Sequence, residues 1–497
     1  MIRFRRFVVV ATILALAVSC TRDDDPHAGV ETGDDLAVVD AMFAHWDVPG
    51  SPGCAVAVSQ DGTLVYSRGY GYANLDYDIP ITPQTVFDVA SVTKQFVAAS
   101  LSVMALEGEL SFDDNVRKWL PELPEYETPV TLWHMVYHTS GLRDYLNLFP
   151  LAGRGEYYPI SHDQILEMTS RQRALIFPSG DRYRYSNTAY MLLAMVVERI
   201  SGKSLGEYVQ ERFFEPLGMK GSLMYDDYER IIPRRAIGYD RDDDGQVRMV
   251  HNFNFDVPGD GQMYTTVEDL LRWDNYLHGE EKPAYYSIIM LEGTLNNGVR
   301  TKRAKGLFLD EYRGLRTVHH TGSSWGFQTV VKRFVDSGLA IAIACNDNNS
   351  SPRSMAWQIA DHYLADQLAP EHDDEEPAGD PQVADMSPEA PTLTSDQLAE
   401  FAGSFFSPEL DATYRFSVED EGLVVRIEQE LPRDVIPVAD DQLEIRYYDP
   451  AYWESPWASL DFDRDRSGAI SGFDLNSGSE RGIVFEKSLI PLSGDGR

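Results

Sequence analysis

The sequence predicts a mixed α/β protein in which a long sheet-and-helix domain precedes a small all-β domain. Three observations lead to this prediction. β-rich runs occur at residues 53–74 and 329–347, helical patterns lie between them, and an acidic, proline-rich interruption at residues 370–394 precedes a series of short strands. Strands at both ends of a long segment, with helices between, favour one antiparallel sheet assembled from the two ends and flanked by helices.

Composition agrees with this fold class. At 497 residues the chain exceeds one ordinary domain, and a hydrophobic content of 43% is that of a core-forming protein. The 79 acidic and 43 basic residues give a formal net charge of −36. Such a charge disfavours binding to nucleic acid or to an anionic membrane surface, so we expect neither partner.

The N-terminal residues 1–20 have the pattern of a bacterial signal peptide. Three arginines precede a short apolar run at residues 7–18, which suits a signal peptide better than a membrane span. The run ends in "LAVSC", which resembles a lipobox, so we predict lipidation of Cys20 and export as a periplasmic or outer-membrane lipoprotein. Ala17 is an unusual residue for a lipobox, which leaves ordinary secretion as the alternative. A polar tether is expected at residues 21–35.

Globular patterning begins at residue 36 and continues to residue 369. Asp61-Gly62 between two β-rich runs indicates a hairpin turn. Helical periodicity then predicts four helices before the β-rich runs return, at residues 94–107, 163–171, 188–200 and 267–277. Cys54 and Cys345 lie in apolar, strand-like runs, and we expect two buried thiols rather than a disulfide.

Residues 370–394 read as a linker, and residues 395–490 as a second domain. In "ATYRFSVEDEGLVVRI" apolar residues alternate, with Tyr414 and Phe416 on one strand and Val425 and Ile427 on the next. Further short β runs separated by turn residues follow. This pattern predicts an antiparallel barrel or sandwich.

The stretch "VFDVASVTKQFVAASL" at residues 86–101 holds a serine and a lysine three positions apart. In a helix Ser91 and Lys94 would share one face. In one interpretation Ser91 caps the helix and Lys94 lies in solvent. In the other Ser91 is a nucleophile, because burial lowers the pKa of a lysine until its amine takes the hydroxyl proton. The pair alone does not decide between them.

Two later stretches supply what a serine nucleophile needs. "RYSN" places Tyr185 and Asn187 before a predicted helix, where the phenol suits a base or proton relay and the amide suits substrate binding. "HHTG" places His320, Thr321 and Gly322 at the start of a β-rich run. A glycine there lets the backbone of a ligand lie close to the strand.

Ser-x-x-Lys, Tyr-x-Asn and His-Thr-Gly, in this order, resemble the motifs of the serine β-lactamase and penicillin-binding-protein superfamily. The tyrosine, with "VTLWHMVYHTSGL" and "GDGQMYTTVEDLLRW", is most similar to the class C β-lactamase and D-alanyl-D-alanine carboxypeptidase branch, over residues 36–368. The resemblance implies a β-lactamase-like catalytic domain at residues 36–369, with a helical subdomain. Residues 395–490 resemble the lipocalin-like β domain appended to many members.

The resemblance also implies a role for each matched residue. Ser91 is expected to be acylated, with Lys94 and Tyr185 sharing proton transfer. The backbone N–H groups of Ser91 and Ser323 are expected to form the oxyanion hole. No metal or organic cofactor is expected. The remaining matched residues are expected to bind the substrate, namely Asn187, His320, Thr321 and Gly322.

His320 departs from the class C pattern, which has lysine at this position. Lysine holds a carboxylate as a cation, whereas histidine is mostly neutral at pH 7. His-Thr-Gly or His-x-Gly occurs instead in D-specific peptidases and esterases of the branch. We therefore predict a serine hydrolase of D-amino-acid peptides or amides, similar to a D-alanyl-D-alanine carboxypeptidase or a D-aminopeptidase, with small esters as further substrates and β-lactams less favoured. The alternatives are a carboxylesterase, a class C-like β-lactamase and a non-catalytic binder or sensor that retains the fold.

Two local patterns mimic sites, but structural roles explain them better. "YHTSGL" puts His138 near a serine, where a buried histidine with satisfied hydrogen bonds is expected. "DFDRDRSGAISGF" has aspartates at alternate positions from Asp461, as in a calcium loop. Arg466 stands where that loop needs glycine and the closing glutamate is absent, so a hairpin turn at Ser467-Gly468 is expected.

Overall fold

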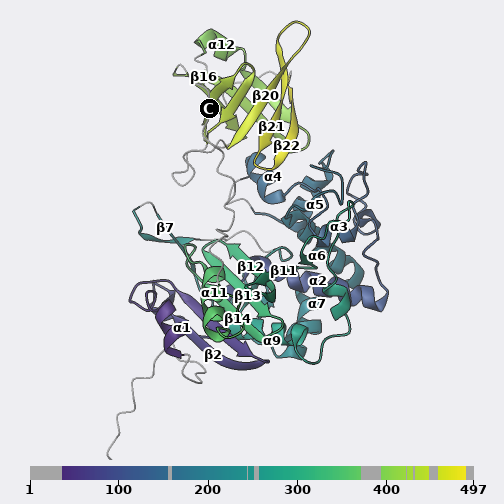
Figure 1. Cartoon of the computed structure of the whole chain (residues 1–497). Helices are drawn as coiled ribbons and strands as arrows, with labels where there is room; N and C mark the ends of the chain where they lie inside the picture. The colour runs from purple at the N-terminus through teal and green to yellow at the C-terminus, as the bar shows by residue number, and fades with distance from the viewer. Residues whose placement is uncertain are drawn as a thin grey trace, which may run out of the picture.

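The computed structural model describes most of the chain, shown in Figure 1. The predicted signal peptide with Cys20, the tether and nearly all of the linker lie outside the described residues, so those predictions stay predictions. Among the helices that the structure does describe, none has the length and apolar character to cross a membrane. The described residues are 36–154, 159–242, 244–250, 257–370, 393–420, 422–428, 431–446 and 457–488.

A seven-stranded antiparallel sheet joins strands from the two ends of the larger domain, as the sequence predicted. Asp61 and Gly62 form the hairpin turn between β1 and β2 with positive φ angles of 50° and 77°, as a type I′ turn requires. The order across the sheet is β10 (Arg303–Ala304), β11 (Leu307–Tyr312), β12 (Leu315–Ser324), β13 (Phe327–Phe334), β14 (Leu339–Cys345), β1 (Cys54–Gln60) and β2 (Thr63–Tyr70).

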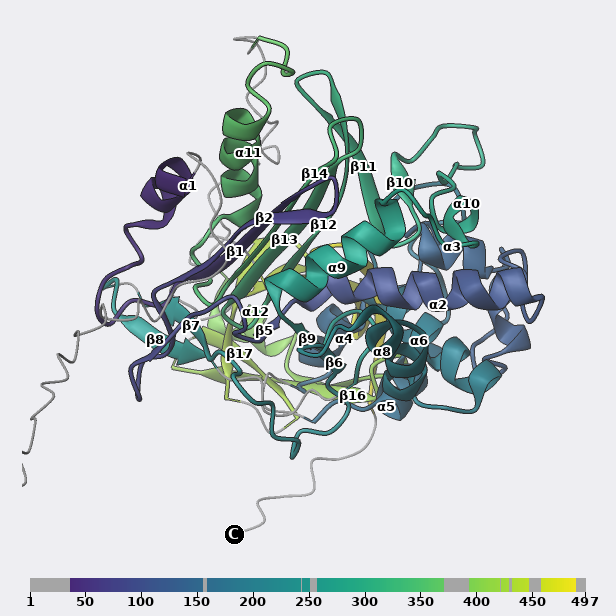
Figure 2. The same cartoon turned by 90° about the horizontal axis from the view of Figure 1, so that it is seen from below.

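Helices cover both faces of this sheet, and a helical region extends from one side of it (Figure 2). All four predicted helices are present as α2, α5, α6 and α9, within one residue at each end. The helices of the larger domain are α1 (Leu36–Phe43), α2 (Lys94–Glu107), α3 (Leu132–Val136), α4 (Tyr145–Leu151), α5 (His162–Ser170), α6 (Asn187–Ser201), α7 (Leu205–Val209), α8 (Glu215–Leu217), α9 (Val267–His278), α10 (Tyr286–Ile289) and α11 (Pro352–Tyr363), with the short helices η1 (Ala90–Thr93), η2 (Val116–Lys118) and η3 (Gln210–Phe214).

Successive side chains along a central strand point to opposite faces of the sheet, so they pack alternately against the helices on one face and on the other. Val56 and Val58 of β1 pack in one apolar cluster with α1 and α11. Ala55 and Ala57 point the other way, into the cluster that contains α2 and α9. Their methyl side chains leave room for α9 to lie close to the sheet, and α2, which begins beside the candidate site, packs in the same cluster.

Three small sheets complete the larger domain. The one formed by β5, β9 and β6 bears on function, because β5 leads directly into the turn before α2. The small sheets contain β3 (Tyr72–Asn74) and β4 (Ile79–Pro80), then β5 (Phe87–Asp88), β9 (Met263–Thr265) and β6 (Leu223–Met224), and finally β7 (Gly238–Arg241) and β8 (Val247–Val250).

Cys54 and Cys345 form a disulfide, so the expectation of two buried thiols is wrong. The two residues lie directly opposite each other on β1 and β14, with Cα atoms 4.0 Å apart. They are 291 positions apart in sequence, and two cysteines give no pairing pattern. The disulfide therefore becomes predictable only once the two ends of the domain are known to be neighbouring strands.

The C-terminal region is a closed barrel of eight antiparallel strands, which decides between the barrel and sandwich that the sequence allowed. Each strand pairs with the next in sequence, and β15 pairs with β22 to close the barrel. The helix α12 (Ser395–Ala399) precedes it. The strands are β15 (Gly403–Ser407), β16 (Ala412–Glu419), β17 (Gly422–Ile427), β18 (Arg433–Ala439), β19 (Gln442–Ile445), β20 (Ala458–Arg464), β21 (Ile470–Ser477) and β22 (Glu480–Lys487).

The side chains that alternate on β16 and β17 fill the barrel. Tyr414, Phe416, Val425 and Ile427 are buried, as the pattern predicted. The hairpin turn expected at Ser467-Gly468 is the β20–β21 turn, in which the Asp465 carboxylate accepts backbone N–H groups of the turn. No cluster of metal-ligating side chains occurs among the described residues.

We expect the disulfide to contribute substantially to stability. Replacing Cys54 and Cys345 with serine should lower the free energy of unfolding by about 2–5 kcal/mol, because the cross-link closes a long loop in the unfolded chain. Thermal unfolding with and without dithiothreitol measures this loss. Reductant should lower the melting temperature of the unaltered protein but not that of the double variant, and alkylation of both cysteines without reductant would contradict the disulfide.

Candidate active site

Ser91 lies in the short helix η1, directly before α2. The preceding residue, Ala90, has a φ of 46°, a left-handed conformation that costs roughly 1–2 kcal/mol for a residue with a Cβ. The Asp88 carboxylate holds this turn by accepting the Ala90 N–H at 2.8 Å. The N-cap of α2 is Thr93, and no side chain caps the helix. Ser91 is therefore not a helix cap, and its hydroxyl is left for other contacts.

Lys94 is fully buried beneath Ser91. Its Nζ donates to Ser91 Oγ at 3.1 Å, to Asn187 Oδ1 at 2.9 Å and to the Asp260 carbonyl at 2.7 Å. Burial lowers the pKa of Lys94 to about 8, and the carboxylates of Asp260 and Asp144 oppose that shift. The amine therefore loses its proton near neutral pH. Its burial also rules out the interpretation in which Lys94 lies in solvent and Ser91 caps the helix.

Tyr185 lies beside Lys94, with Nζ 4.8 Å from the centre of its ring. Burial raises the pKa of Tyr185 well above its usual value of 10, and the smaller effect of Ser91 does not offset this. Tyr185 is thus a protonated phenol in this environment. That state suits a proton relay and disfavours a resting phenolate base.

His138 holds the segment that carries Tyr185. Its ring is buried and stacks on Tyr185 with centroids 4.3 Å apart. Its Nδ1 accepts the N–H of Ser186 at 3.1 Å. The prediction of a buried histidine with satisfied hydrogen bonds is confirmed, and the contacts add that His138 orients the second motif.

His320 on β12 is buried and neutral. Burial lowers its pKa to about 3, and the charge of Lys94 acts in the same direction. Nδ1 lies 2.6 Å from the Thr321 carbonyl and must donate to it, which makes Nε2 the acceptor. Nε2 is buried and has no partner among the described residues. His320 therefore presents a lone pair rather than a positive charge.

Gly322 allows a close approach, but to the protein's own backbone. A Cβ at this position would lie 2.1 Å from the Val89 carbonyl oxygen. β12 thus packs directly against the turn that carries Ser91. The geometry places Gly322 behind the nucleophile, where it positions the turn.

A cavity of about 630 Å³ opens above Ser91. Among the predicted residues, Ser91, Tyr185, Asn187, His320, Thr321 and Ser323 line it. Lys94 and Gly322 do not, because they support the nucleophile from behind. The apolar part of the wall comes from α4, the residues that follow it, β11 and the β12–β13 turn: Leu146, Phe149, Pro150, Ile160, Phe308 and Trp325.

Asp260 also lines the cavity, although no role was assigned to it from the sequence. Its Oδ2 accepts the Tyr145 hydroxyl at 3.1 Å, while Oδ1 is buried without a partner among the described residues. Its carboxylate raises the pKa of Lys94. "GDGQM" was noted only as part of a resemblance, and nothing local in it indicates that Asp260 reaches the lysine.

Residues 39–364 match the Beta-lactamase family. The chain belongs to this family. It is a hydrolase that combines the family's fold with the barrel described above. The site residues that the family motifs suggested occupy one cavity, with their supporting residues directly behind it.

Individual relatives agree with this assignment. A penicillin-binding protein of Bacillus subtilis (strain 168) is 26% identical over 79% of this chain and 87% of its own length. A D-aminopeptidase of Gluconobacter oxydans (strain 621H) is 27% identical over 69% of this chain, which spans only 64% of that longer protein. The octameric penicillin-binding protein homologue from Pyrococcus abyssi has the same fold, with a TM-score of 0.58 and 21% identity over 91% of this chain and 100% of that one.

The pH dependence of acylation should report the ionisation of Lys94. If the neutral amine takes the Ser91 proton, kcat/KM rises with pH through a midpoint near 8. Asp260→Asn removes a carboxylate that raises the pKa of Lys94, so the midpoint should move to lower pH. Glu486→Gln, at an exposed position of the barrel, should leave it in place. A midpoint that is unchanged or higher in Asp260→Asn would contradict this role for Lys94.

Proposed function

We propose that this hydrolase cleaves amide or ester bonds through an acyl-enzyme on Ser91, with D-amino-acid peptides or amides as its main substrates. The observation that carries the proposal is the contact between the buried Lys94 amine and Ser91 Oγ at 3.1 Å. A buried amine with its pKa near 8 is an effective base for a serine hydroxyl. Such proton transfer is typically worth ~10²–10⁴-fold in rate.

The proposed reaction runs in two steps with no added cofactor. Neutral Lys94 takes the proton of Ser91 as Oγ attacks the substrate carbonyl, and the backbone N–H groups of Ser91 and Ser323 stabilise the oxyanion. Tyr185 then gives its proton to the leaving amine and regains one from the Lys94 ammonium. Water attacks the resulting ester by the reverse route, which releases the acid and regenerates Ser91.

The proposed substrate class follows from the charge of the third motif. Arg154 also lines the cavity, but it lies outside that motif. Neutral His320 gives the third motif no cation to pair with a substrate carboxylate. The apolar wall beside Phe149 suits an apolar side chain or acyl group. Relatives named as D-aminopeptidases support a substrate in which a D-residue supplies the acyl group. The same wall and nucleophile would accept small esters.

We also propose that the chain acts outside the cytoplasm as a lipid-anchored protein. The support is the signal-peptide pattern of residues 1–20 ending at Cys20. A buried disulfide is typical of an oxidising compartment. An anchor would hold the enzyme at the membrane without any affinity of its acidic surface for lipid.

Ser91→Ala should abolish acylation. Intact-mass spectrometry of the unaltered protein, incubated with a panel of D-aminoacyl amides, esters and β-lactams, should detect an adduct with at least one class. Ser91→Ala should give none and should unfold within about 1 kcal/mol of the unaltered protein, because Ser91 caps no helix. The absence of any adduct on the unaltered protein would support the binder or sensor alternative.

The enzyme should prefer substrates without a free carboxylate at the leaving group. We expect kcat/KM for an acyl-D-alanyl-D-alanine amide to exceed that for the same peptide with a free carboxylate by about 10-fold or more, which corresponds to about 1.4 kcal/mol. The reason is that the peptide's carboxylate would be desolvated beside neutral His320. Steady-state kinetics with matched leaving groups measures the ratio, and equal values would contradict this reading of His320.

A further inference from the structure

The barrel contacts the larger domain through buried carboxylates as well as apolar side chains. Phe149 and other residues of α4 and α5 share one apolar cluster with the barrel core. Glu409 on the β15–β16 connection and Glu480 at the start of β22 are both buried, and each pairs with an arginine of the larger domain, Arg143 and Arg184 respectively. Figure 1 shows the barrel next to α4 and α5.

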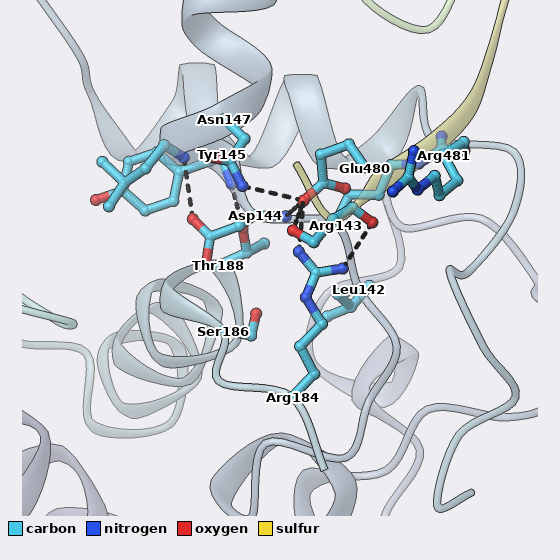
Figure 3. Close-up of polar contacts among 12 residues, drawn as sticks. Leu142, Arg143, Asp144, Tyr145, Asn147, Arg184, Ser186, Thr188, Glu480 and Arg481 are labelled. Carbon is cyan, nitrogen blue, oxygen red and sulfur yellow. Dashed lines mark hydrogen bonds and ion pairs between the residues drawn. The ribbon is translucent and has the colours of Figure 1, made fainter. Parts of the chain in front are cut away.

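Glu480 holds two segments of the larger domain with a single oxygen. Its Oε1 accepts from Arg184 Nη2 at 3.0 Å, Asn147 Nδ2 at 3.2 Å and the Asp144 N–H at 3.3 Å (Figure 3). The Ser479 carbonyl accepts from Arg184 Nη1 at 3.0 Å. The β21–β22 turn thus joins the N-terminus of α4 to the residue directly before Tyr185.

The next contacts lead from this turn to the proposed nucleophile. Asp144 Oδ2 accepts the Asn187 N–H at 2.7 Å, and the Tyr145 N–H donates to Thr188 Oγ1 at 2.7 Å. These two bonds tie the start of α4 to the start of α6. Asn187 Oδ1 in turn accepts from Lys94, which contacts Ser91. A continuous path of hydrogen bonds therefore runs from the barrel to the acylation site.

We propose that Glu480 is a positioning residue of this hydrolase and that the barrel is part of the frame of its active site. Glu480 contacts neither the cavity nor the reacting atoms, so it acts through Asp144 and Arg184. Fixing Asp144 sets the backbone of Asn187 and hence the acceptor that aims the Lys94 amine. Fixing Arg184 sets the adjacent Tyr185. The barrel also supports α4, which forms the apolar wall of the cavity.

Two substitutions at Glu480 distinguish the position of its acceptor oxygen from the negative charge of its carboxylate. Glu480→Gln keeps an acceptor oxygen at the same distance and loses the charge. Glu480→Asp keeps the charge and withdraws the carboxylate by one methylene, about 1.5 Å. If Glu480 acts by position, the aspartate variant is the more impaired, because a misplacement of about 1 Å in a catalytic group costs up to ~10²-fold.

The experiment measures the rate of Ser91 labelling by a fluorophosphonate probe, together with thermal unfolding. We expect Glu480→Asp to lower the second-order labelling rate by about 10-fold or more and Glu480→Gln by about 3-fold or less. Glu409→Asp is the matched control, since it shortens the other buried carboxylate of the same interface. It should lose a similar amount of stability but keep its labelling rate within about 3-fold.

Arg184→Gln interrupts the same path of hydrogen bonds at its other partner. The Arg184 side chain is partly exposed, so this variant should fold even if a Glu480 variant does not. It should slow labelling in the same way as Glu480→Asp, and the double variant should be no slower than the slower single variant. Equal losses in Glu480→Gln and Glu480→Asp, or an equal loss in Glu409→Asp, would overturn the inference. The inference rests on the proposed acylation of Ser91. If that proposal fails, the unaltered protein does not react with the probe, so the two failures can be told apart.

Discussion

The buried amine of Lys94 is the interaction on which the rest of the site depends. Removing an ammonium from water is costly unless each of its protons has an acceptor. Here the acceptors come from three separate segments, which are η1 with Ser91, the start of α6 with Asn187 and the loop before β9 with Asp260. The same burial that makes the site costly to build lowers the pKa of Lys94 and makes the amine a base.

The neighbouring charges keep that pKa within a useful range. Asp260 and Asp144 stabilise the ammonium, while burial favours the neutral amine. Burial also raises the pKa of Asp144 to about 6 and that of Asp88 to about 7. His320 remains neutral and leaves this balance intact, whereas a second cation there would lower the pKa of Lys94 further. His320 thus makes binding of a substrate carboxylate unfavourable, but it is compatible with Lys94 acting as the base.

Local pattern was sufficient for much of the fold and for the residues that carry chemistry. The helix expected at residues 94–107 is α2 with the same bounds, because its apolar periodicity ends at a glycine that adopts the left-handed C-cap conformation. The Asp61-Gly62 turn and the alternating barrel strands are equally local signals. Ser91, Tyr185 and His320 were found because their motifs are contiguous and occur in a fixed order.

What the sequence did not reveal depends on contacts between distant segments. Cys54 and Cys345 become partners only through strand order, and Asp260 reaches Lys94 only through the fold. The protonation state of Tyr185 could not be read from local pattern either, because it depends on the burial that raises its pKa. Glu480 looks like an ordinary hairpin residue in sequence, and its three partners in the larger domain lie more than 290 residues away.

The two interface carboxylates suggest why a barrel is joined to this hydrolase by more than apolar packing. Apolar side chains of α4 pack in one cluster with the barrel core, but apolar packing tolerates small shifts of one surface over the other. A buried ion pair adds little net stability, yet its partners must meet in one geometry or leave a charge unpaired at a cost of about 3–5 kcal/mol. Glu409 with Arg143 and Glu480 with Arg184 therefore each hold one connection of the barrel against the larger domain. Only Glu480 also accepts the Asp144 N–H and adjoins Tyr185 through Arg184, so only its position is transmitted to the catalytic residues.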